Sequence, residues 1–163
     1  MALWLLLAMA PAAAALPPYA LPVAGRTERA RVEPGGLMLE AKLDTGARTS
    51  SLHAANLQFL TRDGQDRVAF DVVDDGGRSV HIDRPLVRIA KIKSAPGIDE
   101  ARPVVTLGIC IGSIYRLTEV NLVDRSTLDK PLLIGRSFLR GRLLVNVNRR
   151  YLLEPACAQK IAP

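Results

Sequence analysis

Short apolar or alternating segments, separated by turn residues, run from residue 37 to residue 147 and constrain the fold of this chain more than any other feature. Segments of about four to eight such residues are typical of β-strands with a buried face. The expected strands are 37–43, 68–73, 79–82, 86–92, 104–111, 116–123 and 143–147. Strands at this spacing predict an all-β barrel or sandwich, and the one short helix is expected at 135–139.

The chain is long enough for one domain with a hydrophobic core. It has 163 residues, of which 48% are hydrophobic, and single cores usually grow to about 250 residues before chains divide. Residues 17–36 are rich in Pro, Gly and Arg and show no sustained period, so we expect a lead-in strand or linker there. The domain itself is predicted to span residues 37–163.

Residues 1–16 carry no charge and consist almost entirely of Ala, Leu, Met and Trp. This run is too short to span a bilayer comfortably, whereas an apolar stretch that ends in small residues is typical of a secretory signal peptide. The alanines at 13–15 offer the cleavage pattern, just before Pro17 and Pro18. No Lys or Arg precedes the run, so retention as an anchor stays open. We predict a periplasmic or secreted protein.

The predicted export also affects how the two cysteines are interpreted. Export would place Cys110 and Cys157 in an oxidising compartment, where thiols tend to pair. Cys110 lies in the apolar run 104–111 and is expected to be a small buried hydrophobe. A disulfide between the two is the open alternative, and neither cysteine has the setting of a nucleophile.

The charge balance restricts the class of partner. The net charge is +6, from 22 Lys and Arg against 16 Asp and Glu, and the basic residues are scattered along the sequence. Only 4% of residues are aromatic, which leaves few platforms for base stacking. We therefore expect no nucleic-acid partner, and we expect acidic substrates or an association with the anionic envelope surface.

The run 39–47 is the most informative for chemistry, because a predicted strand leads directly into Asp44, Thr45 and Gly46. A carboxylate at a strand end stands on a rigid support, and the following glycine permits a close backbone approach. Backbone N–H groups nearby would favour the charged form of the acid. The alternative is an Asx-type turn in which Asp44 only caps the loop.

A second run, 132–139, contains apolar residues, then Gly135 and Arg136, and then another apolar pair. In order and spacing, this run and the Asp-Thr-Gly-Ala loop resemble the retropepsins. In those proteases the later segment crosses the catalytic loop in a psi-shaped support. The resemblance implies that Gly135 lies where the chain crosses closely beneath Asp44, with Arg136 beside it.

A closer resemblance covers residues 37–153, and its motifs are the runs 41–54, 84–87 and 100–105. These runs are similar to a bacterial family long labelled ATP-dependent zinc proteases and now generally regarded as retropepsin-like aspartic peptidases. Members of that family often occur beside an ATP-grasp glutamate ligase and a transglutaminase-like protein. The resemblance implies a single-lobe, closed acid-protease barrel and an aspartic endopeptidase.

Aspartic proteolysis needs two neighbouring carboxylates, and this chain contains one Asp-Thr-Gly. A two-fold homodimer would bring Asp44 together with its symmetry mate. The resemblance implies that Thr45 forms hydrogen bonds across the dimer axis and that Gly46 lets the two loops approach. Ala47 would begin the wall that faces the peptide substrate.

Three other parts of the expected cleft have two interpretations each. Arg48 stands where viral retropepsins carry an acid, and it is interpreted either as a contact for an acidic substrate or as an exposed arginine. His53 follows the acidic corner closely, and we expect a hydrogen-bonded structural residue that could also line the cleft. Residues 91–104 are the candidate flap over the substrate, with an ordinary connecting loop as the alternative.

The two cofactors in the family's old label lack their usual ligands in this sequence. There is no Gly-x-x-x-x-Gly-Lys-Ser/Thr run for ATP and no His-Glu-x-x-His run for zinc. The two histidines, His53 and His81, lie far apart in the sequence with no cysteine near either. We expect neither a cofactor nor a metal. A zinc-dependent peptidase and a non-catalytic periplasmic binding or scaffold domain remain the alternative functions.

Overall fold

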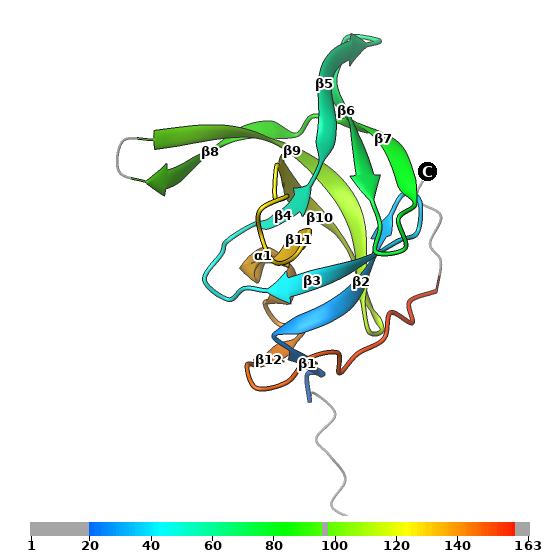
Figure 1. The fold of residues 1–163 in the computed structure, drawn as a ribbon, viewed down its shortest axis with the longest axis vertical. Helices are drawn as coiled ribbons and strands as arrows, with labels where there is room; N and C mark the ends of the chain where they lie inside the picture. Colours follow the sequence, from blue (N-terminus) through cyan, green and yellow to red (C-terminus); the bar gives the residue numbers. More distant parts are fainter. Residues whose placement is uncertain (1–19, 96–97, 159–163) are drawn as a thin grey trace, which may run out of the picture.

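The computed structural model describes residues 20–95 and 98–158, and the side chains of 93–99 are not described. Six strands close into a barrel in the order β10, β4, β11, β3, β2 and β9, with β9 pairing back onto β10 (Figure 1). Their bounds are β2 Thr27–Glu33, β3 Leu37–Leu43, β4 Ser50–His53, β9 Ile98–Ile111, β10 Ile114–Val123 and β11 Leu132–Ile134. The all-β closed barrel predicted from the sequence is confirmed.

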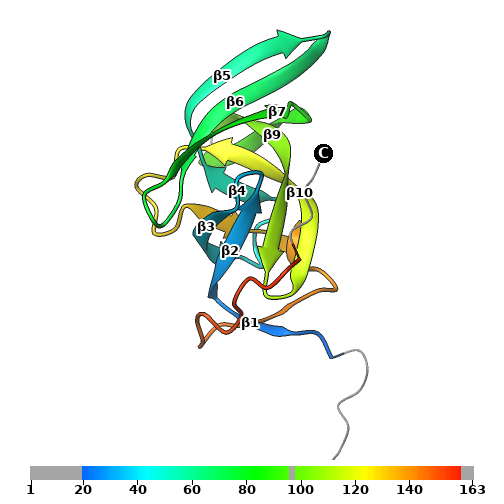
Figure 2. The ribbon, with the colours of Figure 1, turned by 90° about the vertical axis from the view of Figure 1, so that its right-hand side faces the viewer.

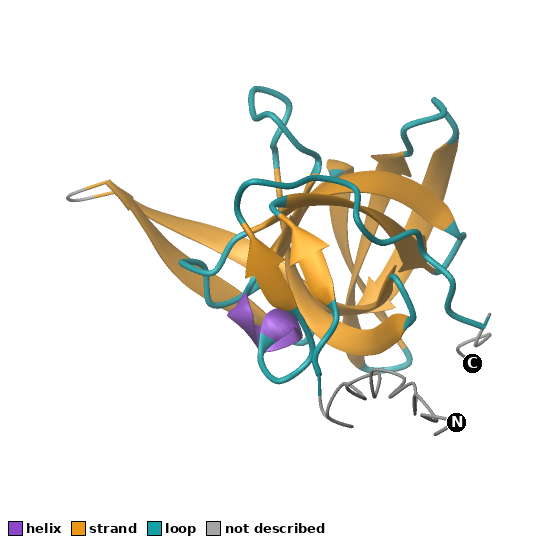
Figure 3. Cartoon of the chain, turned by 90° about the horizontal axis from the view of Figure 1, so that it is seen from below, coloured by secondary structure: helices purple, strands orange, loops and turns teal. Residues whose placement is uncertain are grey.

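The remaining strands and the helix lie around this barrel. Strand β8 (Arg88–Ala95) pairs with β9 in a projecting hairpin, and β5, β6 and β7 form a separate antiparallel sheet beyond the barrel (Figure 2). That sheet consists of β5 Ala55–Arg62, β6 Gln65–Val73 and β7 Ser79–Pro85. Strand β1 (Val23–Gly25) pairs in parallel with β12 (Leu144–Asn146). The helix α1 (Arg136–Leu139) lies against the barrel (Figure 3).

The inward-facing side chains, which alternate along the strands with outward-facing ones, fill the barrel. Leu37, Leu39, Ala41 and Leu43 of β3 all point into the core, and the residues between them are half-buried or exposed. A period of two places every second residue of a strand on one face. Phe138 of α1 is fully buried in the same core. The core therefore holds both β3 and α1 in place, and these elements flank the acidic corner.

The segment expected as a lead-in contributes to the barrel. Strand β2 lies between β3 and β9, and its Ala30 and Val32 are fully buried. The barrel therefore begins on the N-terminal side of the expected boundary at Leu37. The short alternation of β2 is easily overlooked, because its two core residues are small and stand among arginines and glutamates.

A disulfide joins Cys110 to Cys157, with 6.1 Å between the two Cα atoms. Cys110 is a buried residue of β9, as expected, but it is also half of a bridge that the sequence interpretation did not favour. The bridge fastens the tail after β12 to the barrel wall. Within the described residues, no helix has the length and apolar character needed to cross a membrane.

Candidate active site

The acidic corner begins where β3 ends. The backbone N–H of Asp44 donates to the carbonyl of Ile134 at 2.9 Å. Its Oδ1 accepts from the N–H groups of Gly46 at 2.8 Å and Ala47 at 3.1 Å. Among the described residues, Oδ2 has no hydrogen-bond partner, and Thr45 and Gly46 are exposed. One carboxylate oxygen is thus fixed by the backbone while the other is available for chemistry.

Strand β11 supports this corner from below. It pairs in parallel with β3 and antiparallel with β4. Gly135 follows β11 directly, and a Cβ atom there would lie 2.7 Å from the carbonyl carbon and oxygen of Thr49. The Gly135 N–H donates to the buried hydroxyl of Ser50 at 3.1 Å. The chain therefore crosses the loop 44–49 at a distance that only glycine allows.

Arg136 joins the crossing segment to the loop through both its backbone and its side chain. Its N–H donates to the carbonyl of Ala47 at 2.9 Å. Its Nη1 donates to the carbonyls of Thr45 at 3.1 Å and Gly46 at 3.0 Å. Ala47 is half-buried and Arg48 is exposed. These bonds fix the conformation of the loop and place the guanidinium of Arg136 at the surface of the loop.

His53, at the end of β4, faces the loop after β10. Its N–H donates to the carbonyl of Pro131 at 2.7 Å, and its Nδ1 accepts from the N–H of Arg125 at 2.9 Å. The ring also lies 3.4 Å from the carboxylate of Asp124. Its contacts therefore tie β4 to the 124–131 loop.

His81 lies on the outer sheet, where its Nδ1 is 2.6 Å from Oδ1 of Asp71. In the described part of the chain, neither histidine belongs to a group of three or more His, Cys, Asp or Glu side chains placed to hold a metal ion. The residues present therefore offer zinc no ready set of ligands.

Sequence reasoning missed Arg125, which is only 8% exposed. Its Nη1 donates to the hydroxyl of Ser51 at 3.0 Å and its Nε to the carbonyl of Lys130 at 3.1 Å. Burial lowers the pKa of this guanidinium, the charge of Arg102 lowers it further, and the negative charge of Asp44 opposes both. A buried cation thus lies within electrostatic reach of the acidic corner. No local pattern reveals it, because Ser51 and Asp44 are distant from Arg125 in the sequence.

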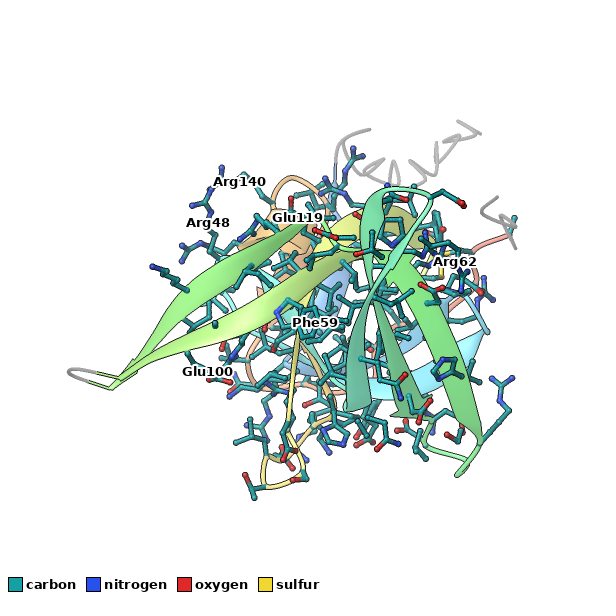
Figure 4. All side chains as sticks on the ribbon, turned by 90° about the horizontal axis from the view of Figure 1, so that it is seen from above. Arg48, Phe59, Arg62, Glu100, Glu119 and Arg140 are labelled. Atoms are coloured by element: carbon teal, nitrogen blue, oxygen red, sulfur yellow. A yellow bond between two sulfur atoms is a disulfide. The ribbon has the colours of Figure 1, made fainter. Side chains whose placement is uncertain are left out.

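A hollow of about 520 Å³ adjoins the loop and is lined by Arg48, Arg116, Arg136, Ser137 and Arg140. We call it the arginine hollow. Figure 4 shows Arg48 and Arg140 on the same side of the molecule, with their side chains directed outward. The sequence suggested scattered basic residues, but the fold gathers four arginines at the loop that follows Asp44. They come from the loop, from β10 and from the region of α1.

The candidate flap, residues 91–104, corresponds to most of the β8–β9 hairpin. The strands pair from Arg88 opposite Val104 outward, and residues 96–97 at the tip lie outside the described residues. The hairpin projects on the same side of the barrel as the loop after β3 (Figure 1). The described part of this segment is therefore a paired hairpin and not an irregular connecting loop.

The barrel, the single Asp-Thr-Gly corner and the glycine crossing define the class of retropepsin-like proteins. The family profile described as retropepsin-like aspartic endopeptidase RimB matches residues 23–155. This match includes every strand of the barrel, the acidic corner and Gly135. The chain therefore belongs to the RimB-like family.

Curated relatives carry a different name. A protein from Desulfotalea psychrophila, named "Probable alpha-L-glutamate ligase", is 32% identical over 111 residues, which cover 66% of this chain and 24% of the relative. One of the same name from Parasynechococcus marenigrum is 33% identical over 111 residues, with the same coverage of 66% and 24%. This chain thus spans about a quarter of the length of these relatives.

A solved structure resembles the chain over more of its length. The crystal structure of a Legionella pneumophila protein of unknown function has a TM-score of 0.70 and 32% sequence identity to this chain. The match covers 80% of this chain and 97% of the other. That protein is therefore similar to this chain in fold over nearly its whole length.

Proposed function

We propose that this protein is an aspartic endopeptidase whose catalytic dyad consists of Asp44 from each of two subunits. The observation that carries the proposal is the asymmetry of the Asp44 carboxylate, with Oδ1 held by two backbone N–H groups and Oδ2 open. The exposed Thr45 and Gly46 would let a second loop approach. Membership of the RimB-like family supports the same reaction.

The chemistry follows from two carboxyl groups that share one proton. The ionised Asp44 removes a proton from water as the water oxygen attacks the peptide carbonyl carbon. The protonated Asp44 of the second subunit gives its proton to the carbonyl oxygen, which produces a neutral tetrahedral diol. The first Asp44, now protonated, gives its proton to the amide nitrogen while the ionised Asp44 of the second subunit takes a proton from one hydroxyl of the diol. The C–N bond then breaks, an acid and an amine are released, and the two carboxyls again share one proton.

The arginine hollow supports an acidic peptide as substrate. Carboxylates pair well with guanidinium groups, whose planar donors match their geometry. The name of the relatives refers to α-L-glutamate, so we propose peptides rich in α-linked glutamate. The uncharged run 1–16 and the disulfide further support export to the periplasm, beside the envelope, where disulfides persist.

The Asp44→Asn substitution tests this function. The amide keeps an oxygen that accepts from Gly46 and Ala47, so the fold should survive, but it cannot act as the base. We expect hydrolysis of a fluorogenic glutamate-rich peptide to fall to background while the melting temperature stays close to that of the wild type. Retained hydrolysis in the pure variant would exclude the dyad. Inhibition by a chelator but not by a pepstatin-type inhibitor would favour a zinc-dependent peptidase instead.

A further inference from the structure

The arginine hollow carries more positive charge than the Asp44 carboxyls of a dyad could neutralise. Four of its five lining residues are arginines. In the described part of the chain, no carboxylate lies within ion-pairing distance of any of them. Glu119, on the same strand as Arg116, is instead paired with Arg88 at 2.6 Å. The hollow therefore presents unneutralised positive charge beside the loop.

Dimer formation would bring this charge to the two-fold axis. The two Asp44 carboxyls of a dyad lie about 3 Å apart, so their loops must meet. Arg136 accompanies the loop, because its Nη1 is bonded to the carbonyls of Thr45 and Gly46. Each subunit adds its own hollow, and charges closer than about 8 Å are poorly screened at physiological ionic strength. Repulsion between the hollows would oppose the assembly that the dyad requires, to the extent that their arginines meet within that distance.

We propose that an acidic peptide bound in the two arginine hollows drives dimerisation, so that substrate assembles the enzyme that cleaves it. This inference rests on the proposed function, because only a dyad demands two chains. A ligand that binds the dimer more tightly than the monomer shifts the equilibrium towards the dimer. Carboxylates along an extended peptide would neutralise both hollows while its backbone lies over the two acids.

The roles of the four arginines differ. Arg116 donates to the carbonyls of Ser137 and Phe138, and Arg136 donates to the loop, so both are fixed by the fold. Arg48 and Arg140 are exposed, and within the described residues their side chains have no hydrogen-bonding or ion-pairing partner. These two are available to a ligand. Removing them should lower the repulsion without loosening the corner.

The test is sedimentation velocity of the full chain carrying Asp44→Asn, which leaves the probe uncut, with and without an octapeptide of α-L-glutamate. We expect the peptide to raise the dimer association constant by about 5–150-fold, the usual range of coupling between two binding events. The variant with Arg48→Ser and Arg140→Ser should dimerise more readily alone and lose the response to peptide. A matched pair outside the hollow, Arg149→Ser with Arg150→Ser, should keep it.

The wild-type chain without peptide separates failure of this inference from failure of the dyad. A dimer that forms equally well with and without peptide, and cleaves, would overturn the inference and leave the proposed function standing. A monomer that cleaves peptide would overturn both. An oligouridylate of equal charge that drives dimerisation as strongly as the octapeptide would overturn the assignment to acidic peptides.

Discussion

Two corners of this molecule have the same local sequence pattern, an aspartate followed two residues later by glycine. In both, the carboxylate accepts from the backbone of that glycine, at 2.8 Å for Asp44 and Gly46 and at 3.0 Å for Asp74 and Gly76. Both are Asx-type turns. The sequence alternative to a catalytic Asp44 was just such a turn, so the turn by itself does not distinguish the two.

The corners differ in what surrounds the turn. Asp74 is fully engaged by its own turn, since Oδ1 also accepts from the N–H of Arg78 and Oδ2 accepts from the guanidinium of the same residue. The second oxygen of Asp44 has no partner among the described residues, and Gly135 crosses directly beneath its loop. In the surface turn, neighbouring residues form hydrogen bonds with both oxygens of the aspartate. In the candidate active site, a strand distant in the sequence supports the loop, and one carboxylate oxygen is left for chemistry.

The largest expected effect comes from filling the crossing. Gly135→Val should destabilise the protein by about 3 kcal/mol and abolish activity, because its side chain would overlap the backbone of Thr49. Gly76→Val is the matched change in the other corner. Its Cβ would meet the carboxylate oxygen of Asp74 at 3.3 Å, and it should cost much less. Urea unfolding of both variants measures the difference, and equal stabilities would show that the crossing does not support the loop.

A smaller effect is expected from the hydrogen bond beneath the loop. Ser50→Ala leaves the buried N–H of Gly135 without its acceptor, which should cost about 1–3 kcal/mol. The loop would also be less firmly held, so the rate of peptide cleavage should fall. Ser113→Ala, on an exposed turn, is the control and should alter neither stability nor rate. Stability and rate unchanged from wild type in Ser50→Ala would contradict the support that we assign to this bond.

The smallest effect belongs to the surface turn. The backbone N–H of Arg78, its side chain and the N–H of Gly76 lower the pKa of Asp74 below the ordinary value of 3.8. A lowered pKa in the folded state stabilises the protein above 3.8 and loses that contribution as the pH falls further. Asp74→Asn should therefore melt slightly below the wild type at pH 7, with full activity. The difference should shrink below pH 3.8, and a constant difference would show that the charge of Asp74 is not involved.

The sequence predicted those parts of the fold and site that have a local signature. The bounds of β3 were predicted correctly, as were the barrel class and the family. Strand β4 was missed because its four residues, Ser50–His53, have no apolar alternation. Strand β5 was missed because most of its side chains are exposed on both faces, including Phe59.

The parts of the site that the sequence did not predict were missed for a different physical reason. Arg125 and the arginine hollow depend on contacts between segments that are far apart in the chain. Cys157 follows the last strand in a tail with no regular structure, so nothing local indicated that it would reach Cys110. Local pattern therefore indicated the acidic corner and the glycine that crosses beneath it, while the arginines around the corner and the disulfide became visible only in the three-dimensional fold.

The central claim is that two chains build one active site, and mixing wild type with Asp44→Asn tests it most directly. At a fixed total concentration of chain, peptide cleavage is measured against the fraction of variant, at the acid-side pH optimum expected for a coupled pair of carboxyls. We predict that activity falls as the square of the wild-type fraction, because a mixed dimer holds only one competent acid. A linear fall, with a monomeric mass in sedimentation of the same samples, would contradict the shared dyad.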